Sequence, residues 1–401
     1  MFFTKVLNNK IATNATSAGL KQLPVRKRVQ MAYDLHIPNK TVNPNLNIRS
    51  HEPIVFVHGI FGSKKNYRQD CQKIANVTHT PVYTVDLRNH GQSIHALPFD
   101  YETLAQDVKD FCDDHGLKKI NLVGYSLGAK ICMLTMLQNP DLVRSGIIID
   151  NSPVEQPHIE IFLQMFVKSM IHVLNSTKIK ADDKDWKSKA NQAMKRYIPN
   201  AGIRDYLLAN LINKVPKGYK SPVINYDDGY IHFQNPVRHM TDVAVKNVSA
   251  WPTEHVKDLK FEGQVRFIKG TQSAFIDETG LKAIKNYFPN YSLSEVNATH
   301  FILNERPLEY VRIICDFIKV NRYKSLQEHL RNVENLSPTE LEAKHQAQHD
   351  KEMEELRQMT KSNNSNTTQS TSGINAEEIS KNLDLANQER QQQEHQKGVR
   401  V

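Results

Sequence analysis

Short, uninterrupted apolar runs recur along the first half of the chain and return near residue 265. Runs of this length are typical of strands that are buried on both faces of a parallel sheet. Between them, apolar residues recur at helical spacing within 104–112 and within 131–137, where Asn139-Pro140 ends the second helix. The pattern predicts an α/β fold, with a mostly parallel central sheet and helices on both faces. The predicted strands are 54–57, 81–86, 120–123, 146–149 and 265–270, with a half-exposed last strand at 291–296.

The alternation of strands and helices breaks between residues 151 and 250. Apolar residues recur at helical spacing through 161–173 and again through 186–211. Two short segments, 223–226 and 230–233, flank Asp227-Asp228-Gly229 and predict a hairpin. We interpret 151–250 as a helical cap inserted into a core made of 34–150 and 251–323.

The two ends of the chain differ from the core in composition. Residues 1–33 contain no acidic side chain and carry six lysines and arginines among Ser, Thr and Asn, which is typical of a mitochondrial transit peptide. A basic leader without an import function is the alternative. Residues 324–401 are polar, helix-permissive at first and then rich in Ser, Thr, Asn and Gln, which predicts an exposed helix followed by disorder. The expected location is mitochondrial.

Composition limits the classes of function. The chain has 401 residues, 39% hydrophobic content and a net charge of +9. Its apolar runs are shorter than the roughly 18 residues of a transmembrane helix, so we expect no membrane span. Basic residues do not form a stripe interleaved with aromatics, so we expect no nucleic acid partner. The four cysteines lie far apart without a C-x-x-C pair, which predicts neither a metal site nor a disulfide framework.

A candidate nucleophile follows the strand at 120–123. The segment Gly124-Tyr125-Ser126-Leu127-Gly128 matches the G-x-S-x-G pattern, in which small residues let a strand and a helix approach closely enough to expose the serine. Since a strand precedes it and a helix follows it, we predict that Ser126 is a nucleophile. An ordinary glycine-containing loop is the alternative.

A second glycine-bearing turn, His58-Gly59-Ile60-Phe61-Gly62, follows the strand at 54–57. In enzymes with a serine elbow, the backbone N–H groups of such a turn help to bind the oxyanion. We therefore expect the amides of Phe61 and Leu127 to form an oxyanion hole. A plain connection between strand and loop is the alternative.

Four segments in order carry a resemblance to a known family. They are 58–62, Asp86-Leu-Arg-Asn-His-Gly-Gln-Ser93, 124–128 and Asp150-Asn-Ser-Pro153. Together they resemble the α/β-hydrolase fold and, within it, the mitochondrial subgroup that contains the abhydrolase-domain-11 proteins and the yeast ethanol acetyltransferases. The resemblance covers residues 50–320. Within it, we interpret Arg88 and His90 as a solvated loop and His58 as packing beside the oxyanion turn.

A serine nucleophile needs a base and an acid, in the chain order Ser, acid, His. His300 follows the last predicted strand and is our choice of base. The acid has two candidates: Asp150, at the end of the strand 146–149, and Asp277, after the strand 265–270, where Ser273 stands at the usual position. We favour Asp150, an arrangement that the yeast acetyltransferases resemble; a helix cap near Pro153 is its structural alternative.

The resemblance implies a reaction. Acetyl-CoA, as donor substrate and without a further cofactor, would acetylate Ser126, and ethanol would accept the acetyl group to give ethyl acetate, with esterase and thioesterase side activities on short esters. Because water can replace the alcohol, a general carboxylic-ester hydrolase is the first alternative. A non-catalytic protein that acts through its cap or tail is the second.

Overall fold

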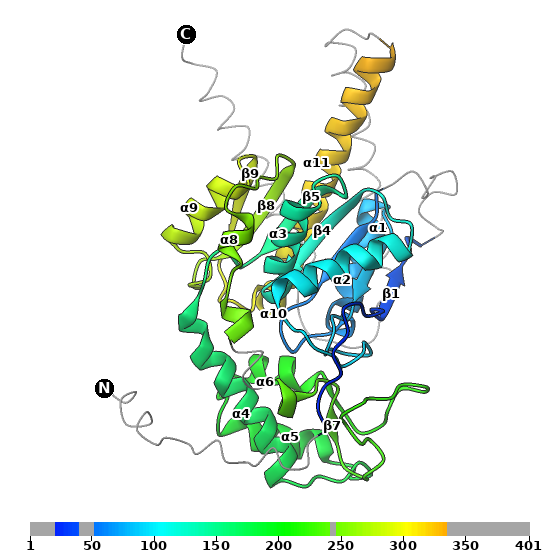
Figure 1. Cartoon of the computed structure of the whole chain (residues 1–401), viewed down its shortest axis with the longest axis vertical. Coiled ribbons are helices and arrows are strands. Elements are labelled where there is room, and N and C mark those ends of the chain that lie inside the picture. Colours follow the sequence, from blue (N-terminus) through cyan, green and yellow to red (C-terminus); the bar gives the residue numbers. More distant parts are fainter. Residues whose placement is uncertain (1–20, 40–51, 241–245, 335–401) are drawn as a thin grey trace, which may run out of the picture. The chain divides into compact units, whose positions relative to one another are not determined.

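A seven-stranded sheet forms the centre of the computed structural model, which describes residues 21–39, 52–240 and 246–334 (Figure 1). Neighbouring strands are parallel, except that β1 is antiparallel to β3. The predicted fold class is confirmed, and β1 is a strand that the sequence pattern did not predict. In order across the sheet the strands are β1 (Tyr33–His36), β3 (Val82–Val85), β2 (Ile54–Val57), β4 (Ile120–Tyr125), β5 (Val143–Ile149), β8 (Gln264–Gly270) and β9 (Tyr291–Val296).

Helices bury both faces of the sheet. Because successive side chains of a strand point to opposite faces, Val55 and Val57 join one apolar cluster with side chains of α2 and α3, whereas Ile54 and Phe56 join another with side chains of α1 and α11. Burial on both faces explains why the strands read as continuous apolar runs. The helices are α1 (Arg68–Thr78), α2 (Tyr101–Asp114), α3 (Leu127–Gln138), α8 (Thr253–Val256), α9 (Glu278–Tyr287), α10 (Ile302–Glu305) and α11 (Pro307–Glu334).

Three parallel strands end at the same edge of the sheet and deliver the predicted site residues there. Ser126 directly follows β4, and Asp150 directly follows β5. His300 lies in the loop between β9 and α10. Ligands of open parallel sheets bind outside the carboxyl ends of the strands, so this edge is where a site is expected.

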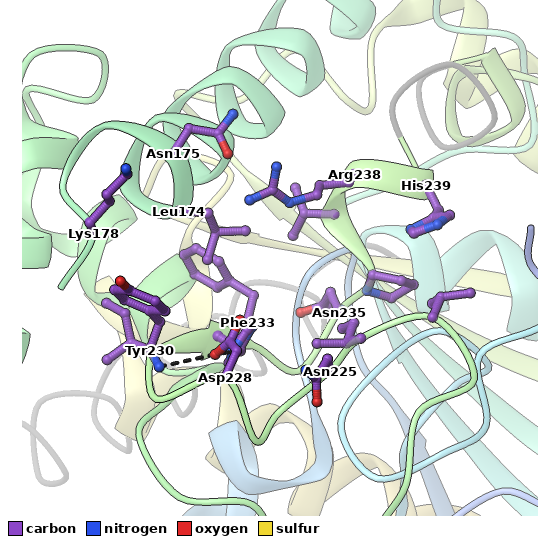
Figure 2. Close-up of a pocket in the computed structure, with 16 residues that line it drawn as sticks. Leu174, Asn175, Lys178, Asn225, Asp228, Tyr230, Phe233, Asn235, Arg238 and His239 are labelled. Atoms are coloured by element: carbon purple, nitrogen blue, oxygen red, sulfur yellow. Dashed lines mark hydrogen bonds and ion pairs between the residues drawn. The ribbon is translucent and has the colours of Figure 1, made fainter. Parts of the chain in front are cut away.

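The cap consists of α4 (Glu160–Ser176), α5 (Trp186–Lys195), α6 (Ala201–Leu208) and a two-stranded sheet, and Figure 1 shows the three helices grouped together. The predicted hairpin is wrong in one strand: β7 (His232–Phe233) pairs with β6 (Leu211–Ile212), not with 223–226. Ser221 Oγ accepts the N–H groups of Val223 and Ile224, which closes a turn where a strand was expected. Between α4 and the loops around β7 the cap forms a half-open cavity of about 460 Å³ (Figure 2).

The chain divides into two compact units, 1–329 and 330–401, and the core and the cap both belong to the first. Residues 21–33 of the predicted leader pack into it: Leu23, Val29 and Met31 are buried, and the Arg26 N–H donates to Leu97 O at 2.7 Å. Residues 1–20 of the leader and 335–401 of the tail lie outside the described residues. In the part that the structure describes, every helix is too short or too polar to cross a membrane.

Candidate active site

Ser126 stands in a strained elbow between β4 and α3. Its φ of 55° and ψ of −115° lie outside the regions that a serine usually adopts. The flanking glycines let β4 and α3 approach each other closely. A Cβ on Gly124 would lie 2.3 Å from Gly128 O, and a Cβ on Gly128 would lie 2.2 Å from Val57 O. The close approach of strand and helix therefore requires both glycines and leaves Ser126 at the edge of the sheet.

Ser126, His300 and Asp150 form one chain of hydrogen bonds. His300 Nε2 lies 2.9 Å from Ser126 Oγ, and His300 Nδ1 lies 2.8 Å from Asp150 Oδ2. With the ring proton on Nδ1, the imidazole donates to the carboxylate and accepts from the serine hydroxyl. This is the geometry in which a histidine removes the proton of a nucleophile while a carboxylate holds its tautomer.

The structure brings only one of the two candidate acids to His300. Asp150 is fully buried, and its Oδ1 accepts the Gly270 N–H at 2.9 Å. Asp277 is instead the N-cap of α9 and accepts the Gly280 N–H at 2.7 Å. Asp277 lies one helical turn beyond the usual acid position and caps α9. The geometry therefore supports Asp150 as the acid of the triad.

Three neighbours of the triad were not predicted from the sequence as site residues. Ser273 Oγ donates to Asp150 Oδ2. The Phe275 ring stacks on the His300 ring, with centroids 3.7 Å apart and planes at 11°. The Tyr125 ring also packs against the His300 ring, with centroids 5.3 Å apart, and the Tyr125 hydroxyl donates to His300 O at 2.9 Å. These contacts fix the orientation of the imidazole. In the sequence, the one sign of them is Ser273, a serine at the position where the acid is usual.

The structure corrects the predicted oxyanion hole. A turn closes between Gly59 O and the Gly62 N–H at 3.0 Å, with φ of 57° at Phe61. Within this turn the Phe61 N–H already donates to His90 Nε2 at 3.1 Å. In the described part of the chain, the N–H groups of Ile60 and Leu127 meet no acceptor. The Phe61 N–H is therefore engaged, and the Ile60 N–H of the same turn is the better candidate to bind an oxyanion together with Leu127.

Two buried histidines, His58 and His90, form hydrogen bonds with the backbone of this turn. His90 Nδ1 donates to Arg88 O at 2.9 Å, so its Nε2 is free to accept from Phe61. His58 packs beside the turn as expected: its Nδ1 donates to Gly59 O, and its Nε2 accepts the Leu87 N–H. Burial lowers the pKa of His58 to about 4, and burial together with the neighbouring His58 lowers the pKa of His90 to about 3. Both rings are therefore neutral near pH 7, with defined tautomers.

The predicted solvated loop at Arg88 and His90 is wrong, because both side chains are fully buried. The Arg88 guanidinium forms a two-pronged ion pair with Asp107 of α2, at 2.6 and 2.7 Å. A buried arginine needs such a partner. In the sequence, an aspartate on the apolar face of the predicted helix 104–112, Asp107, indicated that a buried cation would pair with it.

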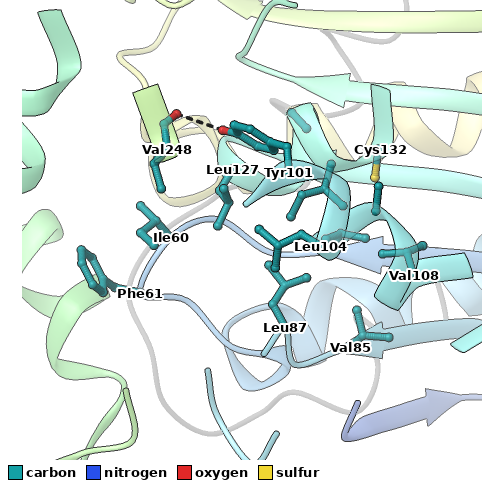
Figure 3. Close-up of a cluster of buried hydrophobic side chains, with 14 of the residues drawn as sticks. Ile60, Phe61, Val85, Leu87, Tyr101, Leu104, Val108, Leu127, Cys132 and Val248 are labelled. Carbon is teal, nitrogen blue, oxygen red and sulfur yellow. Dashed lines mark hydrogen bonds between the residues drawn. The ribbon is translucent and has the colours of Figure 1, made fainter. Parts of the chain in front are cut away.

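The cap rests directly on the oxyanion turn. Tyr206 of α6 donates to Ile60 O at 2.9 Å, and Asn210 Nδ2 donates to Phe61 O. Figure 3 shows Ile60, Phe61 and Leu127 within the apolar cluster that they share with α2. The site is thus walled by buried apolar side chains, where hydrogen bonds to a developing charge are stronger than in water.

No group of three or more His, Cys, Asp or Glu side chains that could hold a metal ion occurs among the residues that the structure describes. The four cysteines are buried and free. At the edge of the sheet the structure brings together a serine, an imidazole and a carboxylate.

Comparisons with known proteins agree with this geometry. The sequence model of the α/β hydrolase fold matches residues 52–183. Ethanol acetyltransferase 1 of Wickerhamomyces anomalus is 81% identical over 396 residues, which cover 98% of this chain and 99% of that protein. Ethanol acetyltransferase 1 of Wickerhamomyces ciferrii is 76% identical over 399 residues, which cover 100% of both chains.

Among solved structures, a marine microorganism esterase superposes with a TM-score of 0.60 at 23% identity, over 72% of this chain and 99% of that one, and this likeness supports the fold. The expected relation to the abhydrolase-domain-11 proteins stays a prediction. The chain has the α/β-hydrolase fold and belongs to the family of the ethanol acetyltransferases.

Proposed function

We propose that this protein is a serine-dependent alcohol O-acetyltransferase that transfers the acetyl group of acetyl-CoA to ethanol and releases ethyl acetate. The observation that carries the proposal is the position of His300, whose two ring nitrogens lie within 2.9 Å of Ser126 Oγ and 2.8 Å of Asp150 Oδ2. The names of the full-length relatives, both ethanol acetyltransferases, support the choice of donor group and acceptor.

The first half of the reaction acetylates the serine. His300 Nε2 takes the proton of Ser126 Oγ as this oxygen attacks the thioester carbonyl. The oxyanion that forms is held by the N–H groups of Ile60 and Leu127. When the C–S bond breaks, the thiolate of CoA takes the proton from the imidazolium, and acetyl-Ser126 remains. Asp150 keeps the Nδ1 tautomer and stabilises the imidazolium in between.

The second half of the reaction transfers the acetyl group from Ser126 to the acceptor. His300 removes the proton of ethanol, the alcohol oxygen attacks acetyl-Ser126, and the serine oxygen leaves with the proton of the imidazolium. Water in place of ethanol gives acetate, which accounts for esterase and thioesterase side activities of the same residues. The rings of Phe275, Tyr125 and Phe301 pack against the His300 ring, with centroids 3.7, 5.3 and 5.8 Å away, and hold in place the imidazole that activates either acceptor.

Two rival functions from the sequence remain distinguishable. A general ester hydrolase would use the same triad, but would release acetate whatever the ethanol concentration. A non-catalytic role through the cap or tail is not what we propose. The strained backbone at Ser126 and the burial of the Asp150 carboxylate have energetic costs that binding alone does not require.

The direct experiment gives purified protein acetyl-CoA with ethanol and quantifies ethyl acetate against acetate. The proposal predicts ethyl acetate, and its loss in Ser126→Ala. Acetate alone at high ethanol concentration would show that the protein is a hydrolase.

We also propose that the protein is mitochondrial, on the acid-free, basic composition of residues 1–33. The burial of Leu23, Val29 and Met31 supports a leader that ends before Leu23, because later cleavage would remove side chains from the core. Mass spectrometry of the N-terminus of the protein isolated from mitochondria tests the location and the cleavage site together.

A further inference from the structure

The cavity of the cap has the size and the polar groups of a ligand site, although neither the triad nor the oxyanion turn lies in it. Its volume of about 460 Å³ is within the roughly 300–1,000 Å³ of small-molecule sites. Figure 2 shows Asn235, Arg238, Lys178 and Tyr230 around it. These side chains come from the end of α4 and from the loops on either side of β7.

One buried side chain at this cavity lacks a partner. Asn235 is 1% exposed; its Nδ2 donates to Asn89 O at 3.1 Å, but its Oδ1 accepts no hydrogen bond from the residues that the structure describes. The Nδ1 atom of His239 is likewise unpartnered, while its Nε2 donates to Lys21 O. Buried polar atoms without a partner are rare and point to a group that completes them. An amide oxygen in this position calls for an N–H donor.

Two cations at the cavity have no counter-ion. Within the described residues, neither Lys178 nor Arg238 forms an ion pair. Among the described lining residues Asp228 is the one carboxylate, and it accepts from the Tyr230 N–H at 3.0 Å and pairs with His232 Nε2 at 2.8 Å. The cavity therefore offers an excess of positive charge, which suits phosphate groups. Beside it, the Tyr230 ring is 40% exposed and offers a surface for a base to stack on.

The inner wall of the cavity adjoins the oxyanion turn. Phe233 pairs in the small sheet with Leu211, whose neighbour Asn210 donates to Phe61 O. On the other side, Asn235 donates to the carbonyl of Asn89, the residue before His90. The cavity wall is thus joined by pairing and hydrogen bonds to the segments that hold the oxyanion turn, which favours a ligand long enough to extend from one to the other.

We propose that the cap cavity binds the nucleotide end of the acyl-CoA donor. The inference rests on the proposed function, since it assigns a place to the donor of that reaction. Lys178 and Arg238 face the phosphates, Tyr230 stacks on the adenine, and Asn235 Oδ1 accepts an N–H of the adenine or of the pantetheine arm. The pantetheine arm then passes the oxyanion turn and brings the thioester to Ser126.

The test uses the full-length protein and two charge variants, Arg238→Ala and the double variant Lys178→Glu with Arg238→Glu. The matched control is Lys285→Glu, an exposed lysine on α9 of the core. Calorimetry measures the Kd of CoA and of 3′,5′-ADP, and kinetics compare acetyl-CoA with p-nitrophenyl acetate, a donor without a nucleotide. Arg238 is exposed, so its truncation does not disturb the core.

In the double variant, the Kd of CoA and the Kd of 3′,5′-ADP should each rise by about tenfold or more. The ratio of kcat/KM for acetyl-CoA to kcat/KM for p-nitrophenyl acetate should fall by a similar factor. Arg238→Ala should show smaller changes in the same direction. Values equal to those of Lys285→Glu, or a wild-type protein that binds neither ligand, would overturn the proposal. If the wild-type protein makes no ethyl acetate, the proposed function fails, but loss of 3′,5′-ADP binding in the double variant still supports the cavity as a nucleotide site.

Discussion

Ser273 donates a hydrogen bond to the same oxygen of Asp150 that accepts from His300 Nδ1. Ser273 follows β8, at the position where the acid is usual, whereas Asp150 follows the neighbouring strand β5. The carboxylate therefore reaches the imidazole from one strand, and the adjacent strand supplies a hydroxyl that orients it. Together with the Gly270 N–H, the serine satisfies the lone pairs of a fully buried charge.

Removing this hydroxyl should slow the reaction without weakening substrate binding. Because a hydrogen bond to a charged group contributes more than a neutral one, Ser273→Ala should lower kcat by about tenfold. KM for acetyl-CoA should stay the same, and Ser273→Thr, which keeps the hydroxyl, should recover most of the rate. Steady-state kinetics measure both constants, and a wild-type kcat in Ser273→Ala would show that the contact does not position Asp150.

The two candidate acids should respond differently to the same amide substitution. Asp150→Asn removes the charge that holds the His300 tautomer, so kcat should fall by about 10³–10⁴-fold. Asp277→Asn changes only the N-cap of α9, so kcat should be unchanged and the free energy of unfolding should change by about 1 kcal/mol at most. Loss of activity in Asp277→Asn with retention in Asp150→Asn would reverse the assignment.

Much of the core could be predicted from the sequence because its strands are buried on both faces. The runs 54–57, 120–123 and 265–270 all lie in strands of the sheet, and Asn139 ends α3 as expected. The G-x-S-x-G pattern was equally informative, since contacts of Gly124 and Gly128 with backbone atoms leave no room for a side chain. In both cases local sequence and tertiary packing require the same residues.

The remaining features depend on contacts between distant segments. The sequence shows the turn at 58–62, but not that His90 accepts the Phe61 N–H, which depends on the φ of 57° and on a loop 29 residues later. Similarly, residues 223–226 are rich in strand-forming side chains, but the Ser221 hydroxyl accepts the N–H groups of Val223 and Ile224. β1 is short and partly exposed, so its apolar pattern is weak.

His90 should matter to catalysis through the turn that it holds. His90→Leu removes the acceptor of the Phe61 N–H, so the Ile60 N–H should lose its alignment and kcat should fall by about 10–100-fold. His90→Gln keeps an acceptor oxygen and should lose less. The measurement is kcat and KM for both variants, with thermal unfolding to compare their stability. Equal loss in the two variants at equal stability would contradict a role in aligning the turn.

The buried histidines predict a loss of stability in mild acid. Burial lowers the pKa of His58, His90 and His95 to about 4, about 3 and about 4, below the value near 6.5 of the unfolded chain. The unfolded state therefore binds more protons as the pH falls below 6.5, and each histidine lowers the free energy of unfolding by up to about 1.4 kcal/mol per pH unit.

Asp86 has the opposite effect on stability, because burial raises its pKa to about 6. Below that pH the folded state binds the extra proton, which offsets the loss of unfolding free energy from about one histidine. Urea unfolding at pH 7, 6 and 5 should show a net decrease in the free energy of unfolding. His95→Asn should show a shallower decrease than the wild-type protein. A free energy that stays constant from pH 7 to pH 5 would contradict neutral, buried histidines.

In the proposed reaction, ethanol and water compete for one acetyl-Ser126 intermediate. The most direct measurement follows ethyl acetate and acetate formed from acetyl-CoA at increasing ethanol concentration, with wild-type protein and Ser126→Ala side by side. The ratio of ethyl acetate to acetate should rise in proportion to the ethanol concentration, and both products should disappear in Ser126→Ala. Acetate as the sole product at high ethanol, or an unchanged rate in Ser126→Ala, would contradict the proposed reaction.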